Sequence, residues 1–325
     1  MNKFILSLLS TLGILLLGVC LLQFVFDGEA VLENMSQIST SLWVLLLALS
    51  LFNYVLRYLR WSYYLKKDMP IGLGHVRHFV IYMAGFALTT TPGKAGEALR
   101  CFYLHNYNIS LKTTMSAFIV ERLMDLWVII LMALAVLSLF TQEQYLLLPV
   151  VLLVIALVFL TLKLPVQSLE QGSLLRKFPR FIRQALKFFF ELIKSAQSLL
   201  TMKITLMSLL IGLLAWGAEG IGLFFLVQSF APEFNAPMIA IGIYGAAMLL
   251  GAFSFLPGGV GGAEACMIFL LMKTGLGTTE AVAITLICRL ATLWFAVVIG
   301  AICTAALTIT GTKPILNKVK YGVSK

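Results

Sequence analysis

Long apolar runs separated by short polar stretches dominate this chain. A helix needs about 20 mostly apolar residues to cross a bilayer. Runs of that kind occupy residues 4–26, 41–65, 113–140, 145–164, 203–230 and 279–309. No small-residue cleavage site follows the first run, so we expect a retained span and not a signal peptide. The pattern predicts an all-α polytopic membrane protein with about six spanning helices, forming one transmembrane domain over residues 1–325.

Two further apolar segments, residues 76–107 and 238–275, are too long for one span and too short for two. Each is broken near its middle by proline and glycine. The break residues are Thr91, Pro92, Gly93 and Gly96 in the first segment and Pro257, Gly258, Gly259, Gly261 and Gly262 in the second. Proline lacks an N–H group and glycine favours open backbone, so a helix does not continue through either break. Each segment is either a broken spanning helix or a re-entrant hairpin that enters the membrane and returns.

The distribution of charge favours the re-entrant hairpins. The chain has 24 Lys and Arg against 14 Asp and Glu, a net charge of +10, and 60% of its residues are hydrophobic, which excludes a water-soluble protein. If both segments are re-entrant, the basic loop residues gather on one side and Lys273 is the one cation in the outer loops. The positive-inside rule then predicts a cell-membrane protein with both termini in the cytoplasm. The basic stretch at about 170–200 is typical of an amphipathic helix on the inner membrane surface. Because topology accounts for the positive charge, we expect no nucleic acid partner.

The chain also repeats itself. Pro92-Gly93 and Gly96 recur as Pro257-Gly258 and Gly261 at an offset of 165, and the Arg-Leu-x-x-Leu-Trp pattern at Arg122 recurs at Arg289. The two units, about 41–140 and 203–309, have opposite orientations in the re-entrant topology. Inverted repeats with broken helices are how many transporters place a site near the bilayer midplane. There we expect the half-helices that follow the two prolines to present free N–H groups, which favour anions.

Eleven ionisable side chains fall inside the expected membrane segments, six basic and five acidic: Arg57, Arg60, Lys94, Glu97, Arg100, Glu121, Arg122, Asp125, Glu219, Glu264 and Arg289. Each costs roughly 2.5–3.5 kcal/mol at a helix centre, so most are expected to face a partner or a polar cavity. The excess of cations leaves room for an anionic guest. The candidate substrate-binding residues are Lys94, Glu97, Arg100, Glu121, Arg122, Asp125, Glu264 and Arg289.

Within this set the expected roles differ. Arg122 and Arg289 occupy matching repeat positions and are the first candidates to contact a headgroup phosphate, since a guanidinium binds two oxygens at once. Glu97 and Glu264 either pair with arginines, bind a cation, take up a proton or cap a helix N-terminus. Arg60 lies near the end of its span, so we expect its side chain to reach the membrane surface.

Catalytic and metal-binding patterns are missing from the sequence. It has no G-x-S-x-G, H-E-x-x-H or P-loop motif. His75, His78 and His105 are expected near the surface without metal-ligand spacing, and the five cysteines show no C-x-x-C spacing. We therefore expect no cofactor and no metal.

At its hairpin motifs the chain resembles the flippase-like integral membrane family defined by the transmembrane region of lysylphosphatidylglycerol synthase. The resemblance rests on Thr91-Pro92-Gly93-Lys94-Ala95-Gly96-Glu97 with Arg100, on Glu121-Arg122 with Asp125, and on the run from Pro257 to Glu264. Two-domain members aminoacylate phosphatidylglycerol in a cytoplasmic domain and flip the product with the membrane domain. This sequence reaches Lys325 without such a domain. The resemblance therefore implies the translocation half and a non-enzymatic role.

The sequence thus predicts a flippase for a phosphate-headed phospholipid or a polyprenyl-phosphate-linked lipid. Two alternatives stay open. One is a membrane glycosyltransferase that uses a lipid-linked sugar, with Glu97 or Glu264 as base, and the other is a non-catalytic partner in lipid biosynthesis of the hopanoid kind. The expected partner is a membrane lipid with an anionic headgroup, and a homo-oligomer or a separate lipid-modifying enzyme is also left open.

Overall fold

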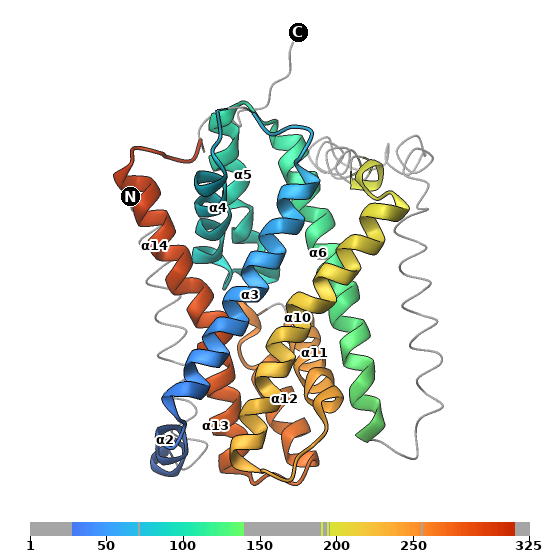
Figure 1. Ribbon diagram of the computed structural model, residues 1–325, viewed down its shortest axis with the longest axis vertical. Coiled ribbons are helices and arrows are strands. Elements are labelled where there is room, and N and C mark those ends of the chain that lie inside the picture. Colours follow the sequence, from blue (N-terminus) through green and yellow to red (C-terminus); the bar gives the residue numbers. More distant parts are fainter. Residues whose placement is uncertain are drawn as a thin grey trace, which may run out of the picture.

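In the computed structural model, residues 28–70, 72–139, 190, 194, 196–254 and 256–315 are described. This part of the chain is helical and contains no strand. Figure 1 shows the long helices crossing one another at a slant along the longest axis of the molecule. The expected spans at 4–26 and 145–164, and most of the basic stretch at 170–200, lie outside the described residues.

The long helices agree with the expected spans to within a few residues. They are α3 (Thr40–Tyr64), α6 (Leu111–Ala133) with its continuation η4 (Leu134–Leu139), α10 (Met202–Phe230), and the joined α13 (Thr278–Arg289), η8 (Leu290–Trp294) and α14 (Phe295–Ile309). The short α2 (Gly28–Ser36) precedes α3. Ser39, Ser110 and Thr201 cap the first turns of α3, α6 and α10, each accepting a backbone N–H three residues on. In the described part of the chain, α3, α10 and the 278–309 helix are long and apolar enough to cross a membrane.

Both broken segments form hairpins. The first consists of α4 (His75–Ala84), η1 (Gly85–Leu88), η2 (Pro92–Ala98), α5 (Leu99–Leu104) and η3 (His105–Tyr107), and the second of α11 (Pro237–Phe253), η7 (Pro257–Gly259) and α12 (Gly262–Lys273). α4 and α5 lie in the upper half of Figure 1 and α11 and α12 in the lower half. Each hairpin begins and ends at its own end of the bundle, and the two breaks meet where η2 contacts η7.

The two breaks share a backbone feature that sequence alone did not reveal. Lys94 has φ 56°, and Gly259, at the same offset of 165 as the paired prolines, has φ 68°. Left-handed backbone is uncommon for a residue with a side chain. Lys94 therefore adopts the same backbone region as the matching glycine of the other break and carries an ammonium group there.

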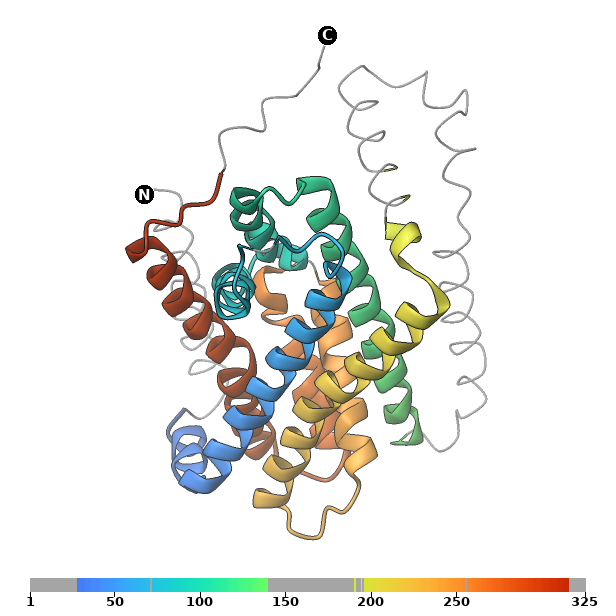
Figure 2. The same cartoon turned by 45° about the horizontal axis from the view of Figure 1, so that its top comes forward.

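Contacts between the two halves come in matching pairs. The first long helices, α3 and α10, pack together; α14 packs on α4 and η1 of the first hairpin, and α6 with η4 packs on α11 of the second. Figure 2 shows α3 and α10 crossing in front of the second hairpin. Small residues make the close contacts: a Cβ on Gly300 of α14 would lie 2.1 Å from the Ala87 nitrogen, and one on Gly245 of α11 would lie 2.7 Å from Met132 Cβ. Membrane helices commonly approach through such residues.

The contact at Gly300 gives a stability prediction. Gly300→Ala forces the backbone of η1 away from α14, and overpacking of this kind costs about 1–3 kcal/mol. We expect a lower midpoint in thermal unfolding of the detergent-purified protein, followed by tryptophan fluorescence. Gly217→Ala is the matched control, because a Cβ there meets nothing within 4 Å. Equal midpoints for the two variants would contradict this packing.

Candidate functional site

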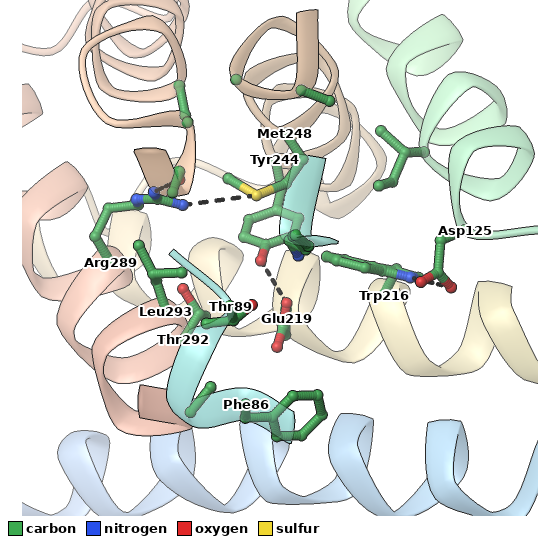
Figure 3. A pocket seen from close by; sticks show the side chains of 18 of the residues that line it. Phe86, Thr89, Asp125, Trp216, Glu219, Tyr244, Met248, Arg289, Thr292 and Leu293 are labelled. Carbon is green, nitrogen blue, oxygen red and sulfur yellow. Dashed lines mark hydrogen bonds between the residues drawn. The ribbon is translucent and has the colours of Figure 1, made fainter. Parts of the chain in front are cut away.

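A cavity of about 260 Å³ lies where the two breaks meet. Its wall takes residues from α3, both hairpins, α6, α10, α13, η8 and α14. Thr91, Gly258 and Gly259 of the breaks are part of this wall, with apolar side chains such as Leu126, Met248 and Leu293 between the polar ones. Figure 3 shows how the labelled side chains converge from these elements. The cavity is therefore built by residues far apart in the sequence.

The charges in the cavity wall are unequal. Its cations are Arg57, Lys94, Arg122 and Arg289, and its carboxylates are Asp125 and Glu219. Four positive groups against two negative ones leave a net formal charge of +2 when both carboxylates are ionised. In surroundings of low dielectric constant this excess attracts an anion much more strongly than it would in water.

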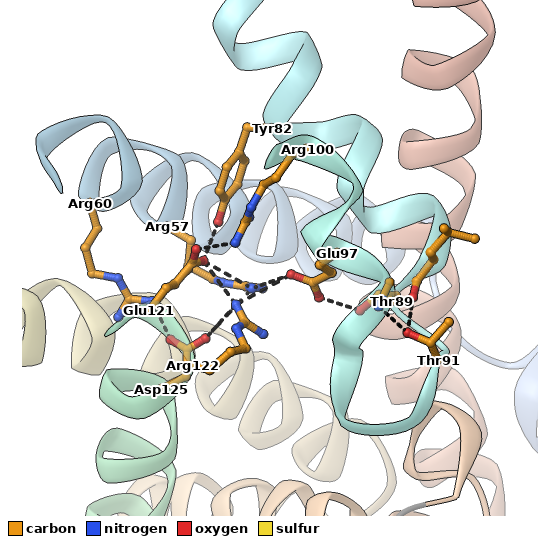
Figure 4. Close-up of polar contacts among 12 residues, drawn as sticks. Arg57, Arg60, Tyr82, Thr89, Thr91, Glu97, Arg100, Glu121, Arg122 and Asp125 are labelled. Atoms are coloured by element: carbon orange, nitrogen blue, oxygen red, sulfur yellow. Dashed lines mark hydrogen bonds and ion pairs between the residues drawn. The ribbon is translucent and has the colours of Figure 1, made fainter. Parts of the chain in front are cut away.

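A dense ion cluster forms one side of the cavity wall and extends behind it. It consists of Arg57, Arg60, Glu97, Arg100, Glu121, Arg122 and Asp125 (Figure 4). Glu121 lies at its centre. Glu121 accepts from Arg100 Nη2 at 2.5 Å and from the Tyr82 hydroxyl at 2.7 Å, and lies 3.1 Å from Arg122 Nη2. Arg122 Nη2 also lies 3.0 Å from Asp125 Oδ2, so Glu121, Arg122 and Asp125 form a local ion-pair network on α6.

Arg60 does not reach the membrane surface, so that prediction was wrong. Its side chain is fully buried, and its Nη2 lies 2.5 Å from Asp125 Oδ1, which also accepts from Trp216 Nε1 at 3.1 Å. A Cβ on Gly212 of α10 would lie 3.1 Å from Arg60 Nη1, so α10 covers the guanidinium. The prediction failed because it considered α3 alone. Asp125 lies on α6, and pairing with it costs less than leaving that carboxylate buried without a cation.

The remaining members of the cluster secure the first hairpin. Glu97 lies 3.4 Å from Arg57 Nη2 and 3.5 Å from Arg122 Nη2, and it accepts from the Thr89 hydroxyl at 2.7 Å. Glu97 is thus an ion-pairing residue and not a helix cap. Arg100 lies 4.1 Å from the ring centroid of Trp61 and 4.5 Å from that of Tyr82. Such cation–π contacts help to offset the desolvation of a buried guanidinium.

Arg289 holds the second break in place. Its Nε donates to Glu264 Oε1 at 2.7 Å and its Nη2 donates to the Gly258 carbonyl at 2.7 Å. The other oxygen of Glu264 accepts the N–H of Gly261 at 2.6 Å. Because the carboxylate of Glu264 accepts this N–H, the N–H is not free to bind an anion. The prediction of free N–H groups at the start of α12 is therefore wrong at Gly261. Of the roles left open for Glu264, arginine pairing and capping are the two observed.

The first break satisfies its own backbone in the same way. The Thr91 hydroxyl accepts the N–H of Gly96 at 2.6 Å and donates to the Leu88 carbonyl at 2.8 Å. The chain after Pro92 continues as the 3₁₀ segment η2 before the six-residue α5 begins. The expected α-helical N-terminus directly after Pro92 is therefore not formed.

Lys94 differs from the other cations of the cavity wall. Its ammonium group lies 4.9 Å from the ring centroid of Trp216, and it forms no ion pair with a carboxylate of the described residues. The positive φ at Lys94 turns the chain at the tip of the first hairpin. Lys94 therefore offers the cavity a positive charge that the protein does not neutralise by direct contact.

Glu219 and Tyr244 form a separate pair across the cavity, where the hydroxyl of Tyr244 on α11 donates to Glu219 on α10 (Figure 3). Glu219 thus has the partner from another helix that a lone buried carboxylate requires. Beside this pair, α13 passes into the π-helical turn η8 (Leu290–Trp294), and the Thr292 carbonyl accepts from the Tyr54 hydroxyl at 2.6 Å. Turns of this type are frequent at functional sites.

Histidines and cysteines contribute little to this site. The prediction that His78 lies near the surface was wrong, because its ring is buried and accepts from Trp61 Nε1 at 3.2 Å. Cys101, Cys266, Cys288 and Cys303 are free thiols. The described residues contain no group of three or more His, Cys, Asp or Glu that could hold a metal ion.

The structure divides the candidate residues into two groups. Lys94, Arg122, Asp125 and Arg289 line the cavity, whereas Glu97, Arg100, Glu121 and Glu264 lie behind its wall and pair with cations. The sequence reasoning did not select Arg57, Trp216, Glu219 and Tyr244, which also line the cavity. Arg57 and Glu219 could have been selected from the sequence, because each places a charge inside an expected span. For Trp216 and Tyr244 no sequence signal separates them from other aromatic residues of an apolar helix.

Comparison with known proteins identifies the family of this chain. The family model described as lysylphosphatidylglycerol synthase TM region matches residues 8–300, a range that includes both hairpins and the whole cavity wall. No curated protein matches the chain. By this match over most of its length, the chain belongs to the lysylphosphatidylglycerol synthase TM region family, a family of membrane proteins with lipid-related function.

Proposed function

We propose that this protein is a lipid flippase, which moves a lipid with a phosphate-bearing headgroup between the two leaflets of the cell membrane. The headgroup passes through the cavity between the opposed hairpins while the acyl or polyprenyl chains stay in the bilayer. This route removes most of the cost of moving a charged headgroup through hydrocarbon. Phospholipids and polyprenyl-phosphate-linked lipids share the phosphate on which the proposal depends.

The observation that carries the proposal is the excess of positive charge in the cavity wall. Lys94 from the first hairpin and Arg289 from the second both line the cavity. Lys94 has no ion-pairing carboxylate among the described residues, while Nη1 of Arg289 donates to the sulfur of Met248 at 3.8 Å, which is a weak acceptor. An anion bound between them would contact both hairpin tips at once.

The size of the cavity fits a headgroup. Sites that bury a whole drug-sized ligand are roughly 300–1,000 Å³. The cavity here is about 260 Å³, which suits a phosphate with a small substituent but not the attached hydrocarbon chains. Two hairpins that enter from opposite ends and meet at a site are the arrangement by which transporters expose that site to each side in turn.

The glycosyltransferase alternative has less support. It needs Glu97 or Glu264 as a general base next to the substrate. Glu97 is fully buried among Arg57, Arg122 and Thr89, and Glu264 is held by Arg289 and the Gly261 N–H. Neither carboxylate lines the cavity. A base must be within hydrogen-bond reach of the proton it removes, and these two are directed elsewhere.

Reconstitution in liposomes tests the proposal directly. We expect the purified protein to accelerate the exchange of fluorescently labelled phosphatidylglycerol between leaflets, as measured by chemical quenching of the outer leaflet. Labelled phosphatidylcholine serves as a comparison with a net-neutral headgroup, and its exchange should be accelerated less. If no anionic lipid, including a polyprenyl phosphate, is exchanged faster than in protein-free liposomes, the proposed function is wrong.

Lys94 gives the sharpest single substitution. Lys94→Gln removes the cation that the protein leaves unpaired, and a hydrogen bond to a charged group contributes about 1.5–3 kcal/mol. We expect phosphatidylglycerol exchange to slow by roughly 10- to 100-fold, with little change in thermal stability, since no ion pair of the described residues is broken. Lys94→Arg should retain most of the rate. Lys273→Gln, at an exposed lysine on α12, is the matched control.

Arg122 and Arg289 should behave differently from Lys94. Arg122→Ala leaves Glu97, Glu121 and Asp125 with one cation fewer, and Arg289→Ala leaves Glu264 without its partner. We expect both variants to exchange lipid more slowly and also to unfold at lower temperature, because breaking a buried ion pair costs about 3–5 kcal/mol. Arg77→Ala, at an exposed arginine, controls for charge removal alone. Wild-type exchange rates in both cavity variants would remove these arginines from the site.

A further inference from the structure

Glu219 is set apart from the other buried carboxylates of the helical bundle. Glu97, Glu121, Asp125 and Glu264 each form at least one ion pair with an arginine. Glu219 is 5% exposed, and within the described residues its recorded partner is the hydroxyl of Tyr244, which is uncharged. A buried carboxylate without a direct cation is costly while ionised, so it favours the uptake of a proton.

Charged and titratable groups from several elements surround Glu219, and Arg122 and Asp125 of α6, which packs on α10, line the same cavity. Tyr54 and Arg57 come from α3, Lys94 from η2, Tyr244 from α11, and Cys288 and Arg289 from α13. The three cations act on Glu219 through space without forming an ion pair with it. These three cations are among the four that line the anion cavity, and Glu219 lies in the same wall.

A second, much smaller pocket is also lined by Glu219. This pocket of about 10 Å³ is lined by Leu46, Ser50, Leu223, Leu226 and Thr292, among others. Leu223 and Leu226 follow Glu219 along α10, so the pocket extends from the cavity toward the C-terminal end of that helix. Glu219 thus lines both the cavity and this small pocket.

We propose that Glu219, held by Tyr244, is a proton-binding site that couples the charge of the cavity to the presence of the anion. The inference rests on the proposed function, because the anion is the transported headgroup. With Glu219 ionised, the wall has four cations and two carboxylates; with Glu219 protonated, it has four cations and one carboxylate. The formal charge rises from +2 to +3. Proton and anion each strengthen the binding of the other, as thermodynamic linkage requires.

We expect the affinity for the anion to fall as the pH rises. At low pH Glu219 is protonated and the anion binds most strongly. As the pH rises the proton is lost, one negative charge appears beside the anion, and affinity falls. The amide in Glu219→Gln resembles the protonated acid in shape and charge, so this variant should retain the high affinity at every pH.

The experiment measures the binding of soluble dihexanoyl phosphatidylglycerol to the detergent-purified protein by calorimetry across a range of pH. We expect the affinity of the wild-type protein to fall by about tenfold as the pH rises, a typical size for such coupling, and that of Glu219→Gln to stay constant. Glu233→Gln, at an exposed glutamate, should behave as the wild type. Tyr244→Phe removes the hydroxyl that stabilises the ionised carboxylate and should move the fall in affinity to higher pH.

Infrared difference spectroscopy tests the proton site without any lipid. The carbonyl band of a protonated carboxylic acid should disappear as the pH rises in the wild type and be missing in Glu219→Gln. Absence of that band, or an identical pH dependence of binding in wild type and Glu219→Gln, would overturn the inference. So would an affinity that follows sodium concentration instead of pH. If lipid exchange fails while the band is present, the proposed function is wrong and the proton site stands.

Discussion

The need to neutralise charge inside an apolar helical bundle controls this structure. Arginine and glutamate are costly in hydrocarbon, and each buried group therefore requires a partner close by. Arg57 and Arg60 of α3 meet Asp125 of α6, and Arg100 of α5 meets Glu121 of α6. These pairs join α3, α5 and α6. The ion cluster thus fixes how the first hairpin sits against α3 and α6, and the position of the hairpin tip follows from it.

Close contacts at glycine residues also hold the two hairpins in place. Gly300 brings α14 against the first hairpin, and Gly242 and Gly245 bring α11 against α6 and η4. Each hairpin is therefore held by a long helix of the other half. Since the hairpins enter from opposite ends and both tips are broken, their meeting point cannot be filled by regular helix. The cavity is the consequence of two interrupted helices facing each other.

The ion pairs divide the charges inside the bundle into two groups. Some hold the structure together, and others are available to a ligand. Glu97, Glu121 and Glu264 lie behind the cavity wall and hold arginines in place. Lys94 and Glu219 line the cavity and lack an ion-pairing partner among the described residues. The first supplies positive charge to an anion, and the second supplies a position where charge can change. A lipid headgroup and a proton are the ligands that we propose for these two residues.

The sequence by itself determined the long helices, the two breaks and the set of charges that had to be neutralised, because hydrophobic length, proline chemistry and the cost of buried charge are local properties. It could not decide which charges pair. Arg60 was expected at the membrane surface, yet it lies under α10 and binds Asp125, whose distance from it in the chain is 65 residues. Tyr244 and Trp216 can be recognised as cavity residues only from the packing of α11 and α10, which places their polar groups against Glu219 and Asp125. Which charges pair depends on which faces of the helices pack together, and this packing is a property of the tertiary structure.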